Sequence, residues 1–151
     1  MNDYFKDLLT YEKGALDELI CTLETVDDSQ KVGKISLMLS HILLAQEVWI
    51  KRLERTIVNH SVRVNIPIDE MKVILESNFM RLMKFVDENK EDLKIDYKNL
   101  KGELYTNTVS DIMSHLAFHS AYHRGQLVLL LKETGITLPD TDYIVFCRKN
   151  K

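Results

Sequence analysis

The chain has 151 residues, 45% of them apolar and 28% charged, so we expect one soluble domain over residues 1–151 rather than a disordered chain. Its net charge of −3, from 20 Lys and Arg against 23 Asp and Glu, argues against nucleic acid as a partner. The charged N-terminal stretch predicts no signal peptide and no membrane association, and two cysteines, Cys21 and Cys147, are too few for a disulfide framework. We therefore expect a cytoplasmic protein.

The first half of the chain predicts long amphipathic helices. Apolar residues recur at steps of three, four and seven from about residue 2 to 25, and a second apolar stripe runs from about 33 to 57. A polar connection follows from Asn59 to Pro67. Asp69 is the predicted N-cap of a third helix that ends near Asn89.

The second half predicts one more long helix. Residues 93–105 leave two interpretations open, a short hairpin or a packed loop. The stretch from Thr108 to Asp111 fits a capping box, so a fourth helix is predicted to run to about Thr134 and to stop at Gly135. The partly apolar tail is expected to pack back on the bundle. These elements predict an all-α four-helix bundle, up-down-down-up or similar in order, with the fourth helix against the second.

Histidines provide the main chemical pattern. His115, His119 and His123 lie in the predicted fourth helix, and their spacing advances each imidazole by about 40°, so all three share one face. Neighbouring pairs can chelate one metal ion, but His115 and His123 are roughly 12 Å apart along the helix. A third ligand is therefore expected from elsewhere. His41 qualifies because it lies on a mainly apolar face of the second helix, where an unpaired imidazole is costly.

Other residues allow functional and structural interpretations side by side. Gln126 projects near His119 and would orient a ligand or substrate, or make a helix–helix hydrogen bond. Arg124 would recognise a carboxylate or face solvent, and Gly125 suggests close helix packing. His60 is expected to be a solvated loop residue. The histidine pair lacks the Glu of the HExxH motif, which argues against a zinc peptidase of that type.

The string HLAFHSAYHRGQLVLLLKETG, followed by LPDTDYIVF, resembles the DinB-like (damage-inducible) family of metal-binding four-helix bundles, and LSHILLAQEVWIKRL resembles its second-helix motif. This resemblance implies three metal ligands, which map onto His41, His119 and His123. His115 matches a recurrent family histidine that usually supports the ligands from outside the coordination sphere. The resemblance also implies a divalent ion, commonly zinc or nickel, and a homodimer.

Function is less closely determined than the metal site. The resemblance implies relatives that are thiol-dependent transferases or isomerases using bacillithiol, mycothiol or glutathione, although many members have no assigned reaction. Three neutral imidazoles leave a position for water or substrate on a divalent ion. The ion could hold a small-molecule thiol as a thiolate for transfer to an electrophilic substrate, or activate water for hydrolysis. A non-catalytic metal-binding stress-response protein and a plain bundle with hydrogen-bonded histidines are the other two hypotheses.

Overall fold

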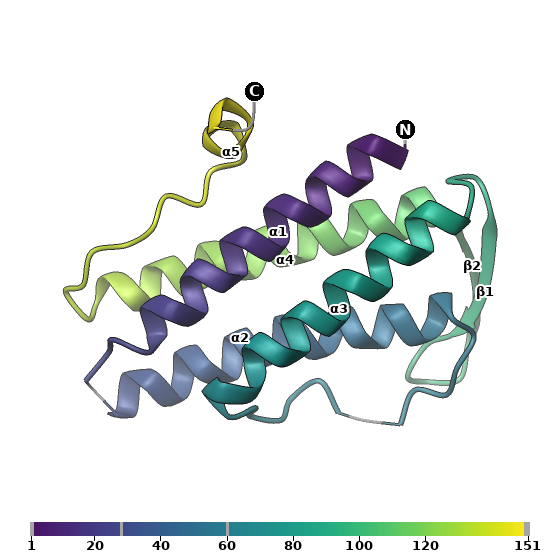
Figure 1. The fold of residues 1–151 in the computed structure, drawn as a ribbon. Helices are drawn as coiled ribbons and strands as arrows, with labels where there is room; N and C mark the ends of the chain where they lie inside the picture. Colours follow the sequence, from purple (N-terminus) through teal and green to yellow (C-terminus); the bar gives the residue numbers. More distant parts are fainter. Residues whose placement is uncertain (1, 28, 60, 150–151) are drawn as a thin grey trace.

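The computed structural model describes residues 2–27, 29–59 and 61–149. Within these residues the chain forms four long helices, a two-stranded hairpin and a short C-terminal helix (Figure 1). In chain order they are α1 (Asn2–Leu23), α2 (Ser29–Leu53), α3 (Ile68–Glu88), β1 (Lys94–Lys98), β2 (Leu104–Thr108), α4 (Val109–Lys132) and α5 (Tyr143–Lys149).

The long helices are arranged in the predicted order. α1 and α4 run in one direction and α2 and α3 in the other, which is the up-down-down-up arrangement (Figure 1). α1 packs mainly on α3, and α2 packs on both α3 and α4. The prediction that the fourth helix lies against the second is therefore confirmed, and the histidine-bearing segments are neighbours.

The boundaries of two predicted helices differ from the structure. α2 spans Ser29–Leu53 instead of about 33 to 57. It ends in a left-handed turn at Arg55, with φ of 57°, and the amide of Thr56 donates to the carbonyl of Lys51 over 2.8 Å. This stop was missed because the left-handed position holds arginine instead of glycine. α3 begins at Ile68, so Pro67 takes the N-cap position and Asp69 lies in the first turn, where its charge favours the helix dipole.

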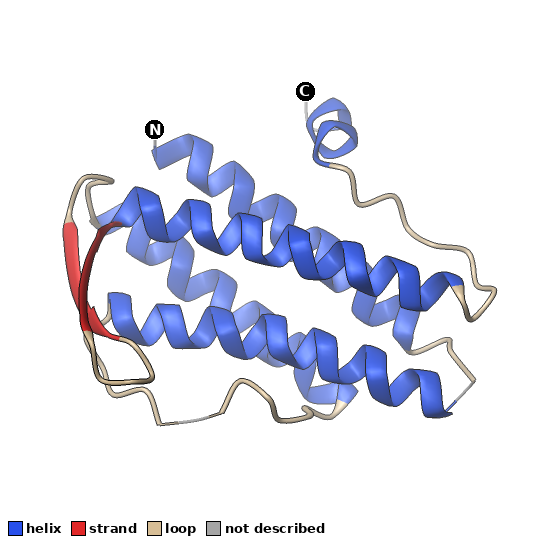
Figure 2. Ribbon diagram, turned by 180° about the vertical axis from the view of Figure 1, so that it is seen from behind, coloured by secondary structure: helices blue, strands red, loops and turns tan. Residues whose placement is uncertain are grey.

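The uncertain segment before α4 is a hairpin, which decides between the two sequence-based interpretations. β1 and β2 are antiparallel, with Ile95 opposite Asn107, and Gly102 adopts a φ of 82° in the connecting turn. The hairpin closes one end of the bundle (Figure 2) and its β1 strand contacts α2. The predicted capping box is confirmed, because Thr108 and Asp111 exchange side-chain-to-backbone hydrogen bonds of 2.9 and 3.1 Å.

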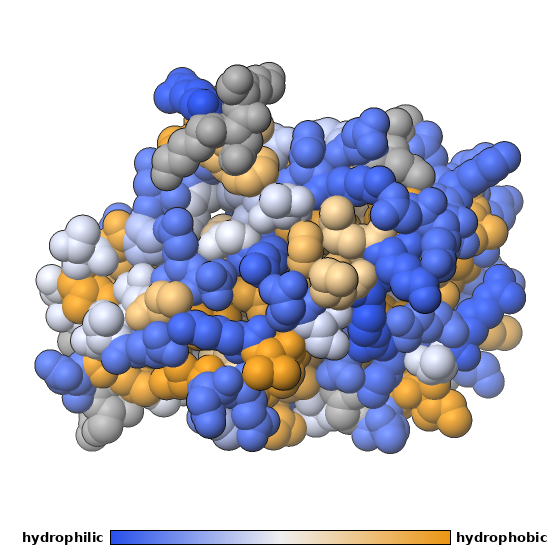
Figure 3. Space-filling view, in the orientation of Figure 1, coloured by the Kyte–Doolittle hydropathy of each residue, from blue (hydrophilic) through white to orange (hydrophobic). Residues whose placement is uncertain are grey.

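Two groups of buried apolar side chains fill the bundle between the helices. One surrounds Leu16, Leu39 and Leu127, and the other surrounds Ile50 and Ile112 near the hairpin. The molecular face that carries α1 and α3 is mostly hydrophilic (Figure 3). Among the described residues, none of the helices combines the length and apolar character needed to cross a membrane.

Three further sequence-based expectations concern single residues and the tail. The tail does pack back on the bundle, because Tyr143 lies against Tyr11 of α1 at a ring-centroid distance of 5.0 Å. Gly125 does not serve close helix packing within this chain, because it is exposed and a Cβ atom there would meet no atom within 4 Å. The prediction for His60 falls outside the described residues.

Candidate metal centre

The structure brings His41, His119 and His123 together between α2 and α4. His119 and His123 lie one turn apart on α4, and His41 faces them from α2. Each offers a ring nitrogen, and the three nitrogens lie within 4.8 Å of one another. The ring centroid of His41 lies 5.3 Å from that of His119 and 4.7 Å from that of His123. The side chains are partly buried, so they remain accessible from one side.

Hydrogen bonds at Nδ1 determine which nitrogen of two imidazoles is free. Nδ1 of His41 lies 3.1 Å from the carbonyl oxygen of Val62. A carbonyl only accepts, so this nitrogen carries the hydrogen and Nε2 keeps its lone pair. Nδ1 of His123 lies 3.0 Å from Oε1 of Gln126, and donation to that amide oxygen leaves Nε2 of His123 free in the same way. Metal-binding histidines commonly make this kind of second hydrogen bond.

The charge state of His119 also suits metal binding. Burial, followed by the neighbouring His123, His41 and His115, lowers the pKa of His119 to about 4. The imidazole is therefore neutral near pH 7 and has a lone pair to offer. A cluster of imidazoles that cannot all carry protons is a favourable place for one divalent cation.

His115 lies next to this cluster but outside it. Its ring centroid is 5.6 Å from that of His119 and 5.1 Å from that of Trp49, and the residue is exposed. Burial of part of the ring and the nearby Arg52 charge lower its pKa. His115 is thus a neutral, accessible imidazole beside the three converging histidines.

Hydrogen bonds hold the connection between α2 and α3 against α2. This connection contains Val62, whose carbonyl contacts His41. The amide of Ile66 donates to Oγ of Ser40 over 2.8 Å, and Oγ of Ser36 donates to Oδ1 of Asn65 over 2.7 Å. Sequence analysis missed these contacts. The only signal in the sequence was the pair Ser36 and Ser40, two small polar residues that precede His41 on an otherwise apolar face of α2.

A buried polar network fixes α4 against α1 behind the histidines. Arg124 forms an ion pair with Glu12 and donates to the hydroxyl of Tyr11 over 2.7 Å. Both charged side chains are almost fully buried. Of the two interpretations of Arg124, carboxylate recognition is correct, but the carboxylate belongs to this chain. Glu12 was not singled out in the sequence because its partner lies 112 positions away.

The donor set fits a divalent transition-metal ion. Imidazole nitrogens suit such ions, and three of them from two helices leave at least one coordination position for another ligand. The fold and this site define a class of protein: a four-helix bundle with a three-histidine candidate metal centre between its second and fourth long helices.

Comparison with known proteins gives the family. The model of the DinB family matches residues 16–150, and the chain belongs to this family. The chain is similar to Protein DinB of Bacillus subtilis (strain 168), with 28% identity over 119 residues, which cover 72% of this chain and 69% of that protein. No solved structure gives a significant match.

Proposed function

We propose that the protein is a metal-dependent thiol S-transferase or a closely related enzyme, with zinc or nickel held by His41, His119 and His123. The observation that carries this proposal is the convergence of three imidazoles, two of which have Nε2 left free by hydrogen bonds at Nδ1. A purely structural metal site normally uses four protein ligands, so a three-histidine set favours a reactive centre.

The chain's own groups would support such a reaction. A bound divalent ion would supply Lewis acidity that lowers the pKa of a small-molecule thiol and favours its thiolate. His115, neutral and exposed beside His119, would accept the thiol proton and pass it to solvent. A carbon–sulfur bond would form at the electrophilic carbon while its leaving group departs with the bonding electron pair. We place this chemistry in the cytoplasm, where low-molecular-weight thiols are kept reduced.

Metal analysis and a spectroscopic probe test this proposal. Protein purified without an affinity tag should contain about one divalent ion per chain, and replacement by Co²⁺ should give a visible spectrum. Glutathione, bacillithiol and mycothiol are then added separately, and a thiolate-to-cobalt charge-transfer band identifies a thiol that reaches the ion. Turnover is measured with halogenated arenes and epoxides, with His119→Ala as the control variant.

The outcomes separate the functional classes. A charge-transfer band together with turnover that is lost in His119→Ala supports the transferase. Hydrolysis of an electrophile in the absence of a thiol would indicate a metal-dependent hydrolase instead of a transferase. Tight metal binding without either reaction would favour a non-catalytic metal-binding stress-response protein. Protein that binds no metal would overturn the proposal and leave a plain helical bundle.

We also propose that the protein forms a homodimer through α4. Phe118, Tyr122 and Leu129 are exposed and lie within about 40° of one another around this helix. The exposed Gly125 lies in the same stripe and would allow close approach of a partner helix. Sedimentation should show a dimer for the parent and a monomer for Phe118→Lys, and a parent that stays monomeric at high concentration would contradict this.

A further inference from the structure

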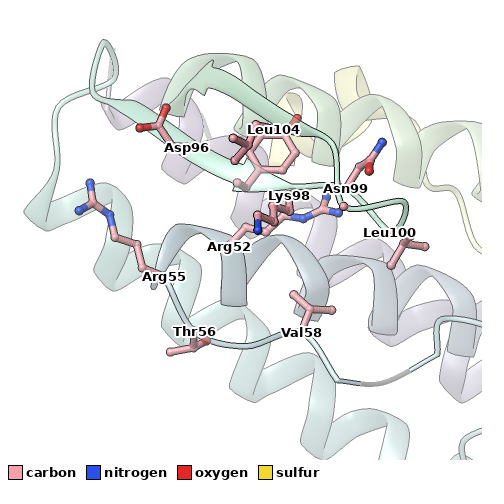
Figure 4. A pocket seen from close by; sticks show the side chains of 11 residues that line it. Arg52, Arg55, Thr56, Val58, Asp96, Lys98, Asn99, Leu100 and Leu104 are labelled. Carbon is pink, nitrogen blue, oxygen red and sulfur yellow. The ribbon is translucent and has the colours of Figure 1, made fainter.

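An open cleft lies where the end of α2 meets the hairpin (Figure 4). Its volume is about 700 Å³. Among the described residues that line it, Arg52, Arg55 and Lys98 are basic and Asp96 alone is acidic. Oδ1 of Asp96 already accepts a 2.6 Å hydrogen bond from Thr106, and its carboxylate points away from Arg52 (Figure 4). The cleft therefore offers positive charge to an incoming ligand.

Arg52 is the unusual group in this cleft. Its guanidinium lies 4.4 Å from the ring centroid of Trp49 and 4.8 Å from that of Tyr97. Its Nε is buried and has no hydrogen-bond partner among the described residues. Burial lowers the pKa of Arg52, opposed by the neighbouring Tyr97 phenol. A guanidinium that has lost part of its hydration is costly, and an anionic ligand on its N–H groups would offset part of that cost.

The cleft is connected to the histidine cluster by successive side-chain contacts. Arg52 lies over Trp49, the ring of Trp49 lies 5.1 Å from His115, and His115 lies 5.6 Å from His119. Long helical side chains lean toward the N-terminus of their helix, so Arg52 leans from the end of α2 back toward His41.

We propose that Arg52, assisted by Lys98, binds a carboxylate of the small molecule whose other end reaches the three histidines, with Trp49 and His115 between the two points. This inference rests on the proposed function, because it takes that molecule to be the thiol or its electrophilic acceptor. The planar guanidinium can make paired hydrogen bonds to a carboxylate or a phosphate. The C-terminal end of α2 carries partial negative charge, which disfavours a dianion more than a monoanion and so favours the carboxylate.

The experiment uses S-methylglutathione, which has two carboxylates but no free thiol. Trp49 is the only tryptophan in the chain and lies under Arg52, so its fluorescence reports occupancy of the cleft. The probe is titrated into the protein as purified, and its dimethyl ester, which lacks both carboxylates and keeps the ammonium group, serves as the matched ligand. We expect the ester to bind at least about tenfold more weakly, because hydrogen bonds to a charged group are lost.

Variants locate the binding group. Arg52→Gln should weaken binding of the acid by at least about tenfold, and Arg52→Lys should weaken it by an intermediate factor because the ammonium has no planar fork. Arg55→Gln is the matched control: it changes net charge equally, yet Arg55 is exposed and points away from Arg52 (Figure 4). Lys98→Gln, an exposed strand position, gives a second test if the Arg52 variants fold poorly by circular dichroism.

The remaining outcomes are decisive. Equal binding of acid and ester, or equal losses in the Arg52 and Arg55 variants, would overturn the carboxylate site. Inorganic phosphate that displaces the acid as well as succinate does would also contradict it. In His119→Ala the acid should still bind at least about tenfold more tightly than the ester, and loss of that difference would place the carboxylate on the metal. The cobalt–thiolate band tests the proposed function in a separate measurement. Failure of the carboxylate site can therefore be distinguished from failure of the proposed function.

Discussion

The hydrogen bond from His123 to Gln126 allows a quantitative test of the candidate metal centre. Both residues belong to α4, and Nδ1 of His123 donates to Oε1 of Gln126 over 3.0 Å. Replacing Gln126 by Leu keeps the size of the side chain but removes the acceptor. The imidazole then loses both its fixed orientation and part of its basicity. Loss of such a supporting hydrogen bond typically lowers metal affinity 10–100-fold, or about 1.4–2.7 kcal/mol.

The assay is competition for Zn²⁺ against a chelator of known affinity, with circular dichroism to verify the helical content. Gln126→Glu is the matched control, because its carboxylate still accepts from Nδ1 and its charge makes the imidazole a stronger ligand. We expect the Glu variant to bind Zn²⁺ at least as tightly as the parent, and the Leu variant to bind it more weakly than the parent. A Leu variant that binds like the parent, or a Glu variant as weak as Leu, would refute the argument.

Three further predictions concern the histidines and the buried network. In the same competition assay, His41→Ala should lower metal affinity by more than about 100-fold and His115→Ala by less. Equal losses would contradict the assignment of His41 as a metal ligand and His115 as a residue beside the ligands. Glu12→Gln leaves the Arg124 charge buried and unpaired, so urea unfolding should show a loss of about 3–5 kcal/mol, and an unchanged midpoint would contradict the network. In metal-free protein the pKa of His119 is about 4 when folded and near 6.5 when unfolded, so stability is lost as pH falls through that window. His119→Gln should therefore show a shallower pH dependence of the free energy of unfolding between these two pKa values.

Much of the architecture follows from the sequence because its causes are local. Helical periodicity depends on neighbours three and four positions apart, so the long helices are predicted within a few residues of their ends. The capping box from Thr108 to Asp111 involves three consecutive backbone steps and is recognised directly. The common face of His119 and His123 follows from helical geometry alone. His41 was expected as the third member from its place on the apolar face of α2, and the resemblance to the DinB-like family, which the family match confirms, implied the same residue.

Tertiary structure decided what depends on groups distant along the chain. The partner of Arg124 is Glu12, and the acceptor for Nδ1 of His41 is the Val62 carbonyl, 21 positions away in a connection without regular structure. No spacing rule identifies such partners, because they depend on how helices pack and on where a loop is attached. The end of α2 at Leu53 is likewise set by a left-handed Arg55, a conformation that arginine seldom adopts. Arg52 shows the same limit, because only the packing of the hairpin over α2 buries its Nε without a hydrogen-bond partner among the described residues, at the edge of a cleft.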